Sequence, residues 1–107
     1  MANPVILIVD DEIQVLNAVE RDLRQHYAKD YRIIKASSGK EGLETVQKLK
    51  QRNDQIALFL VDQRMPEMGG TEFLEKAMEI YPEAKKALLT AYADTQAAIS
   101  AINRVSL

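Results

Sequence analysis

Four short runs of apolar residues stand out along the chain. They cover Val5–Val9, Tyr31–Ala36, Ile56–Val61 and Ala87–Thr90. The first and third runs are almost continuously apolar, which is typical of strands that are buried on both faces of a parallel sheet. The second run is more mixed, so we expect it to lie nearer the edge of the sheet.

The segments between these runs carry apolar residues at helical spacing. In each segment the apolar positions recur at intervals of about three to four residues, and charged residues fill the positions between them. This pattern predicts amphipathic helices that each cover a sheet with one face. The four apolar stripes are Leu16, Val19, Leu23 and Tyr27; Leu43, Val46 and Leu49; Leu74, Ala77, Met78 and Tyr81; and Ala98, Ile99 and Ile102.

Local signals mark where these helices begin and end. Ser38 is a candidate N-cap for the second helix, because its hydroxyl can accept a hydrogen bond from a free backbone N–H group. Gly69–Gly70 opens the third helix, and Tyr81–Pro82 closes it, since the residue before a proline disfavours helical geometry. Strands and helices therefore alternate strictly, which predicts an α/β fold with a parallel sheet and right-handed connections.

Composition and charge narrow the class of protein. The 107 residues suit one domain, and 47% apolar residues with a net charge of −2 allow a core under a mixed surface. We expect a single domain over residues 1–107 that does not bind nucleic acid directly, because no basic patch stands out. The lack of cysteine excludes a thiolate metal site and a disulfide framework. No apolar run approaches the ~20 residues of a membrane span, so we expect a cytoplasmic protein.

Acidic residues and one hydroxyl follow the predicted strands at their carboxyl ends. Asp10, Asp11 and Glu12 come after the first strand, Asp62 after the third, and Thr90 ends the fourth. The carboxyl ends of parallel strands meet at one edge of the sheet, where ligands bind in this class of fold. Carboxylates crowded at this edge repel one another, and a hard divalent cation relieves that repulsion. The pattern therefore favours a Mg²⁺ site.

Each of these residues also has a plainer interpretation when it is considered alone. Asp11 or Glu12 can serve as a negative charge at a helix start, and an aspartate such as Asp62 is common in turns. Thr90 is equally compatible with an ordinary strand end. Their joint occurrence at carboxyl ends, with none at amino ends, favours a shared site.

Three motifs in this order resemble the response-regulator receiver domain of two-component signalling. Ile8–Glu12 (IVDDE) is similar to the acidic pair that follows the first strand in that family. Leu60–Gly70 (LVDQRMPEMGG) is similar to the phosphoacceptor segment, and Leu88–Ala91 (LLTA) to the strand that carries a switch hydroxyl. The resemblance runs through the whole chain and implies a flavodoxin-like sheet with strand order 2-1-3-4-5.

The resemblance implies a role for each site residue. Asp62 is the phosphoacceptor and takes a phosphoryl group from a histidine kinase, a phosphotransfer protein or a small phosphodonor. Asp10, Asp11 and Asp62 bind Mg²⁺ together with the backbone carbonyl of Arg64, and Asp11 does so more directly than Asp10. Thr90 senses the phosphoryl group and shifts a neighbouring surface that acts on a partner or an output domain.

The chain departs from the family pattern toward its C-terminal end. Receiver domains carry a lysine after a fifth strand, and this sequence ends before such a strand, so we expect a C-terminally incomplete receiver with any output domain beyond Leu107. Lys85 and Lys86 do not replace that lysine, because they precede the fourth predicted strand. Arg64 and Tyr92 occupy positions that tune the access of water to the acyl phosphate in the family. An idle, exposed side chain is an equally good interpretation of both.

A missing last strand and helix would leave part of the sheet uncovered. We expect the edge of the fourth strand to be open, and the sheet face near Val5, Leu7 and Ile56 to be exposed. Apolar surface of this kind rarely stays bare in a soluble monomer. We therefore expect this chain to self-associate.

Three functions from different classes remain open. The leading hypothesis is a signalling receiver that catalyses only its own phosphorylation and dephosphorylation at Asp62 and is not otherwise an enzyme. The second is a degenerate receiver that acts as a phosphate-independent interaction module; the presence of the acceptor, the metal pair and the threonine disfavours it, although the missing lysine keeps it open. The third is a small Mg²⁺-dependent phosphohydrolase, which the lack of a second general acid disfavours.

Overall fold

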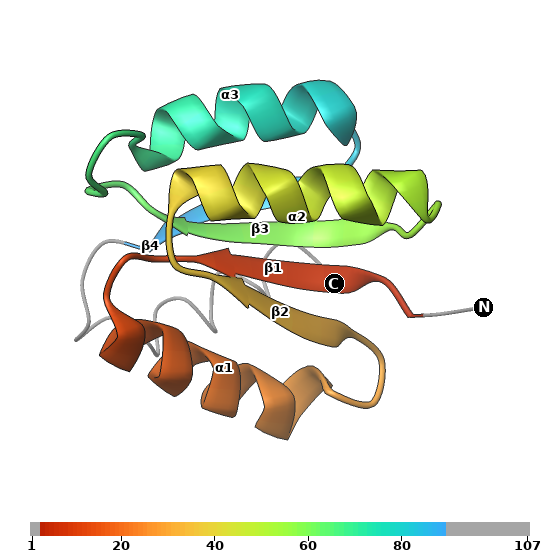
Figure 1. Cartoon of the computed structure of the whole chain (residues 1–107). Helices are drawn as coiled ribbons and strands as arrows, with labels where there is room; N and C mark the ends of the chain where they lie inside the picture. The colour runs from red at the N-terminus through yellow and green to blue at the C-terminus, as the bar shows by residue number, and fades with distance from the viewer. Residues whose placement is uncertain (1–2, 90–107) are drawn as a thin grey trace.

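The hydrophobic runs form a parallel four-stranded sheet in the order β2-β1-β3-β4 (Figure 1). The computed structural model describes residues 3–89. Within them the predicted α/β fold class and strand order are confirmed, and β2 is an edge strand as expected. The strands are β1 (Val5–Val9), β2 (Arg32–Ala36), β3 (Ile56–Asp62) and β4 (Lys85–Leu89). The helices are α1 (Ile13–Tyr27), α2 (Gly39–Gln51) and α3 (Gly70–Ile80).

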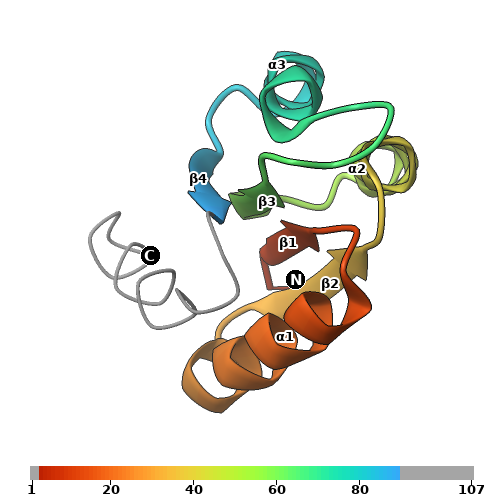
Figure 2. The same cartoon turned by 90° about the vertical axis from the view of Figure 1, so that its left-hand side faces the viewer.

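Helices cover both faces of this sheet. α1 lies on one face, and α2 and α3 lie together on the other (Figures 1 and 2). Successive residues of the central strands alternate between the two layers, so that Ile6 and Ile8 pack with the α1 side chains, whereas Leu7 and Phe59 pack with those of α2 and α3. Every residue of β1 is buried as a result. This burial on both faces explains why the β1 sequence is continuously apolar.

The expectation of an exposed sheet face is wrong at the three residues named for it. Val5 and Leu7 are fully buried, and Ile56 is only 5% exposed. All three belong to the core between the sheet and the α2–α3 layer, together with Phe73. The alternation of side chains along the strands sends these residues to the face that α2 and α3 already cover.

The start of α2 confirms the predicted N-cap. The Ser38 hydroxyl accepts a hydrogen bond from the Glu41 N–H group (3.0 Å), and a Glu41 carboxylate oxygen accepts one from the Ser37 N–H group (3.0 Å). Farther along, α2 packs tightly on α3 at Gly42, where a Cβ atom would lie 2.7 Å from the Phe73 ring. This contact fixes the spacing of the two helices on that face.

The fourth strand begins earlier than the sequence predicts. Lys85 and Lys86 pair with Leu58 and Phe59 of β3, so both lysines lie within β4 and not before it. Their side chains are exposed, and hydrophobicity therefore gave no signal, although the backbone ladder extends to them. Thr90, at the predicted end of this strand, and the predicted fourth helix lie outside the described residues.

The helices within residues 3–89 are amphipathic segments of the domain, and none is long and apolar enough to cross a membrane. α1 has 15 residues and buries Val15, Val19 and Leu23. Arg21 and Arg24 lie on its exposed side. This is the pattern of a helix that packs on a sheet with one face.

Candidate functional site

Two of the predicted site residues lie side by side because the two central strands are neighbours. β1 and β3 pair in parallel, with Val9 opposite Val61. Asp62 is the last residue of β3, and Asp10 directly follows β1. An aspartate thus follows each member of this Val9–Val61 pair. Both emerge at the carboxyl edge of the sheet, where open parallel sheets bind their ligands.

Asp11 joins Asp10 and Asp62 in a cluster of three carboxylates. One oxygen atom from each of the three lies within 4.8 Å of those of the other two. Asp10 is buried with 3% of its surface exposed, Asp62 is half-buried, and Asp11 is exposed. The structure therefore brings together the three carboxylates that the sequence pattern singled out.

Burial and mutual repulsion raise the pKa of two of these carboxyl groups. The pKa of Asp10 is raised to about 6. Burial is the largest cause of this rise, and the nearby charges of Asp62 and Asp11 add to it. The Glu12 backbone N–H group donates a hydrogen bond to Asp10 Oδ1 (2.9 Å) and opposes this rise. Burial also raises the pKa of Asp62, against the hydrogen bond from the Arg64 backbone N–H group. The protein thus crowds carboxyl groups at a place that disfavours their charged forms.

This donor set fits a hard divalent cation. None of the ion pairs within residues 3–89 involves Asp10, Asp11 or Asp62. A cation among the three carboxylates would favour their charged forms and offset their repulsion. The donors are oxygen atoms, with no thiolate or imidazole in the cluster. Such a set suits Mg²⁺, which prefers a few carboxylates and retains several waters.

Of the other residues considered for the site, Arg64 and Glu12 are described by the structure, and two are not. Arg64 is exposed in the loop after β3, and its backbone N–H group lowers the pKa of Asp62. Glu12 is the N-cap residue of α1, and its side chain makes no capping hydrogen bond. Thr90 and Tyr92 lie outside the described residues.

Gln63, which directly follows Asp62, is a site-loop residue that sequence reasoning missed. Its side-chain oxygen accepts hydrogen bonds from the backbone N–H group (3.1 Å) and the hydroxyl (2.9 Å) of Thr71. A signal for this role existed, because Gly69 is the N-cap residue of α3 and has no side chain with which to cap the helix. A polar residue elsewhere in the loop was the natural substitute.

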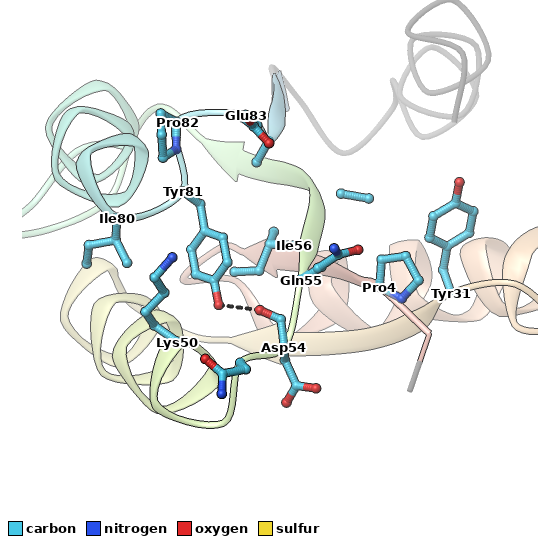
Figure 3. A pocket seen from close by; sticks show the side chains of 13 residues that line it. Pro4, Tyr31, Lys50, Asp54, Gln55, Ile56, Ile80, Tyr81, Pro82 and Glu83 are labelled. Atoms are coloured by element: carbon cyan, nitrogen blue, oxygen red, sulfur yellow. Dashed lines mark hydrogen bonds between the residues drawn. The ribbon is translucent and has the colours of Figure 1, made fainter. Parts of the chain in front are cut away.

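A separate pocket of about 630 Å³ lies at the opposite, amino edge of the sheet (Figure 3). Residues that precede β1, β3 and β4 line it, among them Pro4, Gln55 and Glu83. Beside it the Tyr81 hydroxyl donates a hydrogen bond to the Asp54 carbonyl (2.6 Å), which ties the α3–β4 connection to the α2–β3 connection (Figure 3). The carboxylate cluster lies at the other edge, so this pocket takes no part in its chemistry.

Comparison with known proteins matches residues 6–105 to the response regulator receiver domain. The hydrogenase transcriptional regulatory protein HoxA of Cupriavidus necator is 30% identical over 95% of this chain, which covers 19% of HoxA. The transcriptional regulatory protein ZraR of Escherichia coli is 31% identical over 95% of this chain and is covered to 21%. The chain thus spans about a fifth of the length of these curated relatives.

Solved structures show the same likeness. A response regulator receiver domain protein from Clostridium thermocellum is 27% identical, with a TM-score of 0.66 over 94% of this chain and 75% of that one. The chemotaxis protein CheY4 of Vibrio cholerae has a TM-score of 0.75 over 97% of this chain and 99% of its own, and at 20% identity it supports the fold alone. The match over nearly the whole sequence carries the assignment: the chain belongs to the family of response regulator receiver domains.

Proposed function

We propose that this receiver domain accepts a phosphoryl group on Asp62 in a Mg²⁺-dependent reaction and thereby acts as a phosphorylation switch in a two-component system. Receiver domains are signalling modules, and the cluster of three carboxylates is the observation that carries this finer proposal. A domain that served only as an interaction module would have no need to crowd Asp10, Asp11 and Asp62 where burial and repulsion disfavour their charged forms.

In this proposal the Asp62 carboxylate is the nucleophile. One of its oxygens attacks the phosphorus atom of the donor, and a new O–P bond forms. The bond from phosphorus to the leaving group breaks, and the leaving group, a histidine imidazole or the acetate of acetyl phosphate, departs with the bonding electron pair. The Arg64 backbone N–H group beside the Asp62 carboxylate lowers its pKa and so favours the charged, nucleophilic form.

Asp10, Asp11 and Asp62 would hold the metal, together with the backbone carbonyl of Arg64. Mg²⁺, when bound, neutralises charge on the transferring group. The protein's own part is to hold the nucleophile at the strand end and to keep Asp10 fixed through the hydrogen bond from the Glu12 N–H group (2.9 Å). Positioning and electrostatics therefore account for most of the expected acceleration.

The donor in the cell, in this proposal, is a histidine kinase or a phosphotransfer protein of the cytoplasm. Thr90 binds an oxygen of the phosphoryl group and shifts the surface that a partner or an output domain recognises. HoxA and ZraR are transcriptional regulatory proteins several times longer than this chain. That length supports an attached output domain in the whole protein.

Exposure to acetyl phosphate with and without Mg²⁺, followed by intact-mass spectrometry, tests the proposal. We expect the wild-type chain to gain the mass of one phosphoryl group with Mg²⁺ and to gain none with excess chelator. Asp62→Asn should gain none, whereas Asp30→Asn, the same change at an exposed turn beyond α1, should gain as much as wild type. An inert wild-type chain would favour the interaction module, and continuous release of inorganic phosphate at a high rate would favour the phosphohydrolase.

A further inference from the structure

The side chain of Gln63 bridges the loop between β3 and α3. Its oxygen accepts one hydrogen bond from the Thr71 N–H group (3.1 Å) and another from the Thr71 hydroxyl (2.9 Å). The two residues are eight positions apart, and the loop between them contains Arg64. These two hydrogen bonds therefore link the beginning of the loop, at Gln63, to its end, at Thr71.

The backbone of Gln63 makes a third bond to the same helix end. Its carbonyl accepts a hydrogen bond from the Gly70 N–H group (3.1 Å). The first N–H groups of a helix have no partner within the helix and need an acceptor from outside. Since the N-cap Gly69 offers no side chain, residue 63 supplies the acceptors for both Gly70 and Thr71.

The helix that Gln63 holds is itself firmly anchored. Phe73 and Ala77 of α3 are fully buried in the core beneath the sheet face. The start of α3 also lies directly against β3, the strand that ends at Asp62: a Cβ atom on Gly70 would lie 2.5 Å from the Asp62 carbonyl oxygen. A residue fastened to this helix end is thereby fastened to the core.

The bonds of Gln63 bear on the chemical site because of its neighbours in the chain. Asp62 precedes it, and Arg64 follows it. The backbone N–H groups of Arg64 and Gln63 both face the Asp62 carboxylate closely enough to lower its pKa. The conformation of the loop backbone therefore determines the position of the Asp62 carboxylate and that of the Arg64 carbonyl.

We propose that Gln63 is a positioning residue for phosphoryl transfer: through Thr71 it fastens the loop that orients the Asp62 carboxylate and the Arg64 carbonyl to helix α3. This role rests on the proposed function of Asp62. Both Gln63 and Thr71 are exposed, so water can replace their mutual hydrogen bonds at small cost to stability. The principal consequence of losing the bridge is a looser site and not a less stable fold.

Gln63→Leu is the direct test, because leucine is of similar size and offers no acceptor. We expect this variant to bind Mg²⁺ about tenfold more weakly than wild type, as loss of a group that orients metal ligands commonly does, and to be labelled more slowly by acetyl phosphate. Thr71→Val should show part of this loss. Thr71→Ser keeps the hydroxyl donor and should bind Mg²⁺ and be labelled as wild type is. In the double variant Gln63→Leu/Thr71→Val the two losses should not add, because both remove one bridge.

Ser38→Ala is the matched control, since Ser38 also caps a helix at this edge of the sheet but bonds only within the α2 segment. We expect it to lower the melting temperature and leave the Mg²⁺ affinity unchanged. If wild type is labelled and Gln63→Leu equals it in Mg²⁺ affinity and labelling rate, the role of Gln63 is overturned while the proposed function stands. The same holds if Ser38→Ala weakens Mg²⁺ binding as much as Gln63→Leu does. If wild type neither binds Mg²⁺ nor takes the label, both proposals are overturned.

Discussion

The charge state of Asp10 governs how the site responds to pH. Burial raises its pKa from 3.8 to about 6, so the folded, metal-free protein disfavours the charged form. Folding therefore favours protonated Asp10. The resulting stabilisation of the folded protein is fully present below about pH 3.8 and is lost as the pH rises through about 6. Burial raises the pKa of Asp62 as well, and its contribution changes with pH in the same sense.

Mg²⁺ should reverse this trend, because it binds the charged carboxylates. We predict that Mg²⁺ affinity falls as the pH is lowered through about 6, where protons compete for Asp10. Thermal unfolding with and without Mg²⁺ measures this: the rise in melting temperature on adding Mg²⁺ should be larger at about pH 8 than at about pH 5. An equal rise at both values would contradict the assignment of Asp10 to the metal site.

The two neighbouring aspartates should contribute unequally to metal binding. Asp10 is buried and already accepts a hydrogen bond from the Glu12 N–H group, whereas Asp11 is exposed and free to turn toward a cation. We predict that Asp11→Asn weakens Mg²⁺ binding by about tenfold, or about 1.4 kcal/mol, and more than Asp10→Asn does. Titration calorimetry of both variants, with Asp30→Asn as a control, checks this. Wild-type affinity in Asp11→Asn would remove Asp11 from the site.

The residue-scale chemistry was only partly predictable from the sequence. Asp10, Asp11 and Asp62 could be found because each follows an apolar run, and parallel strands bring such positions to one edge. The pKa of Asp10 could not be foreseen, since it depends on burial that only the packed structure defines. The glycine at the N-cap position of α3 signalled that another residue must supply an acceptor, but nothing pointed to Gln63, because its partner, Thr71, lies across a loop whose path no periodic pattern specifies.

Among the secondary-structure elements, α3 begins directly against the end of the strand that carries Asp62. Gly70 lies so close to β3 that a Cβ atom would be 2.5 Å from the Asp62 carbonyl oxygen. We predict that Gly70→Ala costs about 1–3 kcal/mol of unfolding free energy and weakens Mg²⁺ binding, because backbone atoms must move to admit the methyl group. Denaturant unfolding and Mg²⁺ titration measure the two effects.

Gly69→Ala is the control for that substitution. A Cβ atom there would lie 3.1 Å from the Gln63 carbonyl oxygen, a milder contact that a small shift of the loop can relieve. The loss of stability should therefore be clearly smaller than for Gly70→Ala. Equal stability of Gly70→Ala and wild type would show that α3 does not constrain the site in this way.

Within residues 3–89 the elements followed from hydrophobic patterning, except that the start of β4 was misplaced. The cap at Ser38 and the limits of α3 were predicted because local chemistry sets them. The start of β4 was misplaced because Lys85 and Lys86 are exposed and yet pair with β3 through their backbones. Side-chain polarity does not report such pairing when a strand lies near the surface.

At the scale of the whole molecule, the two edges of the sheet have different roles. The carboxyl edge gathers the three aspartates, and the amino edge carries the pocket beside Tyr81, where a hydrogen bond ties two connections together (Figure 3). The carboxyl-edge site followed from the alternation of strands and helices, whereas the strand order came from the resemblance to receiver domains. The error at Val5, Leu7 and Ile56 arose because the pattern showed that both faces are buried but not which helices bury which residues.

Self-association of the chain stays a prediction, now on a narrower basis. The sheet face at Val5 is buried, so it no longer supports the expectation. Within residues 3–89, β4 forms an edge of the sheet, and Leu88 on it is 46% exposed. Unpaired strand edges with apolar side chains favour pairing between chains. Size-exclusion chromatography with light scattering at micromolar concentration should show a dimer or larger species, and Leu88→Asp should reduce it; a wild-type monomer throughout would refute the expectation.

Direct mapping of the phosphorylated residue tests whether Asp62 is the phosphoacceptor. After treatment with acetyl phosphate and Mg²⁺, borohydride reduces an aspartyl phosphate to homoserine with loss of phosphate, and peptide mass spectrometry then locates the reduced residue. We predict homoserine at position 62 in wild type and in Asp30→Asn, and none at any position in Asp62→Asn. Reduction at another aspartate, or none in a wild-type chain that binds Mg²⁺, would contradict the assignment of Asp62 as the phosphoacceptor.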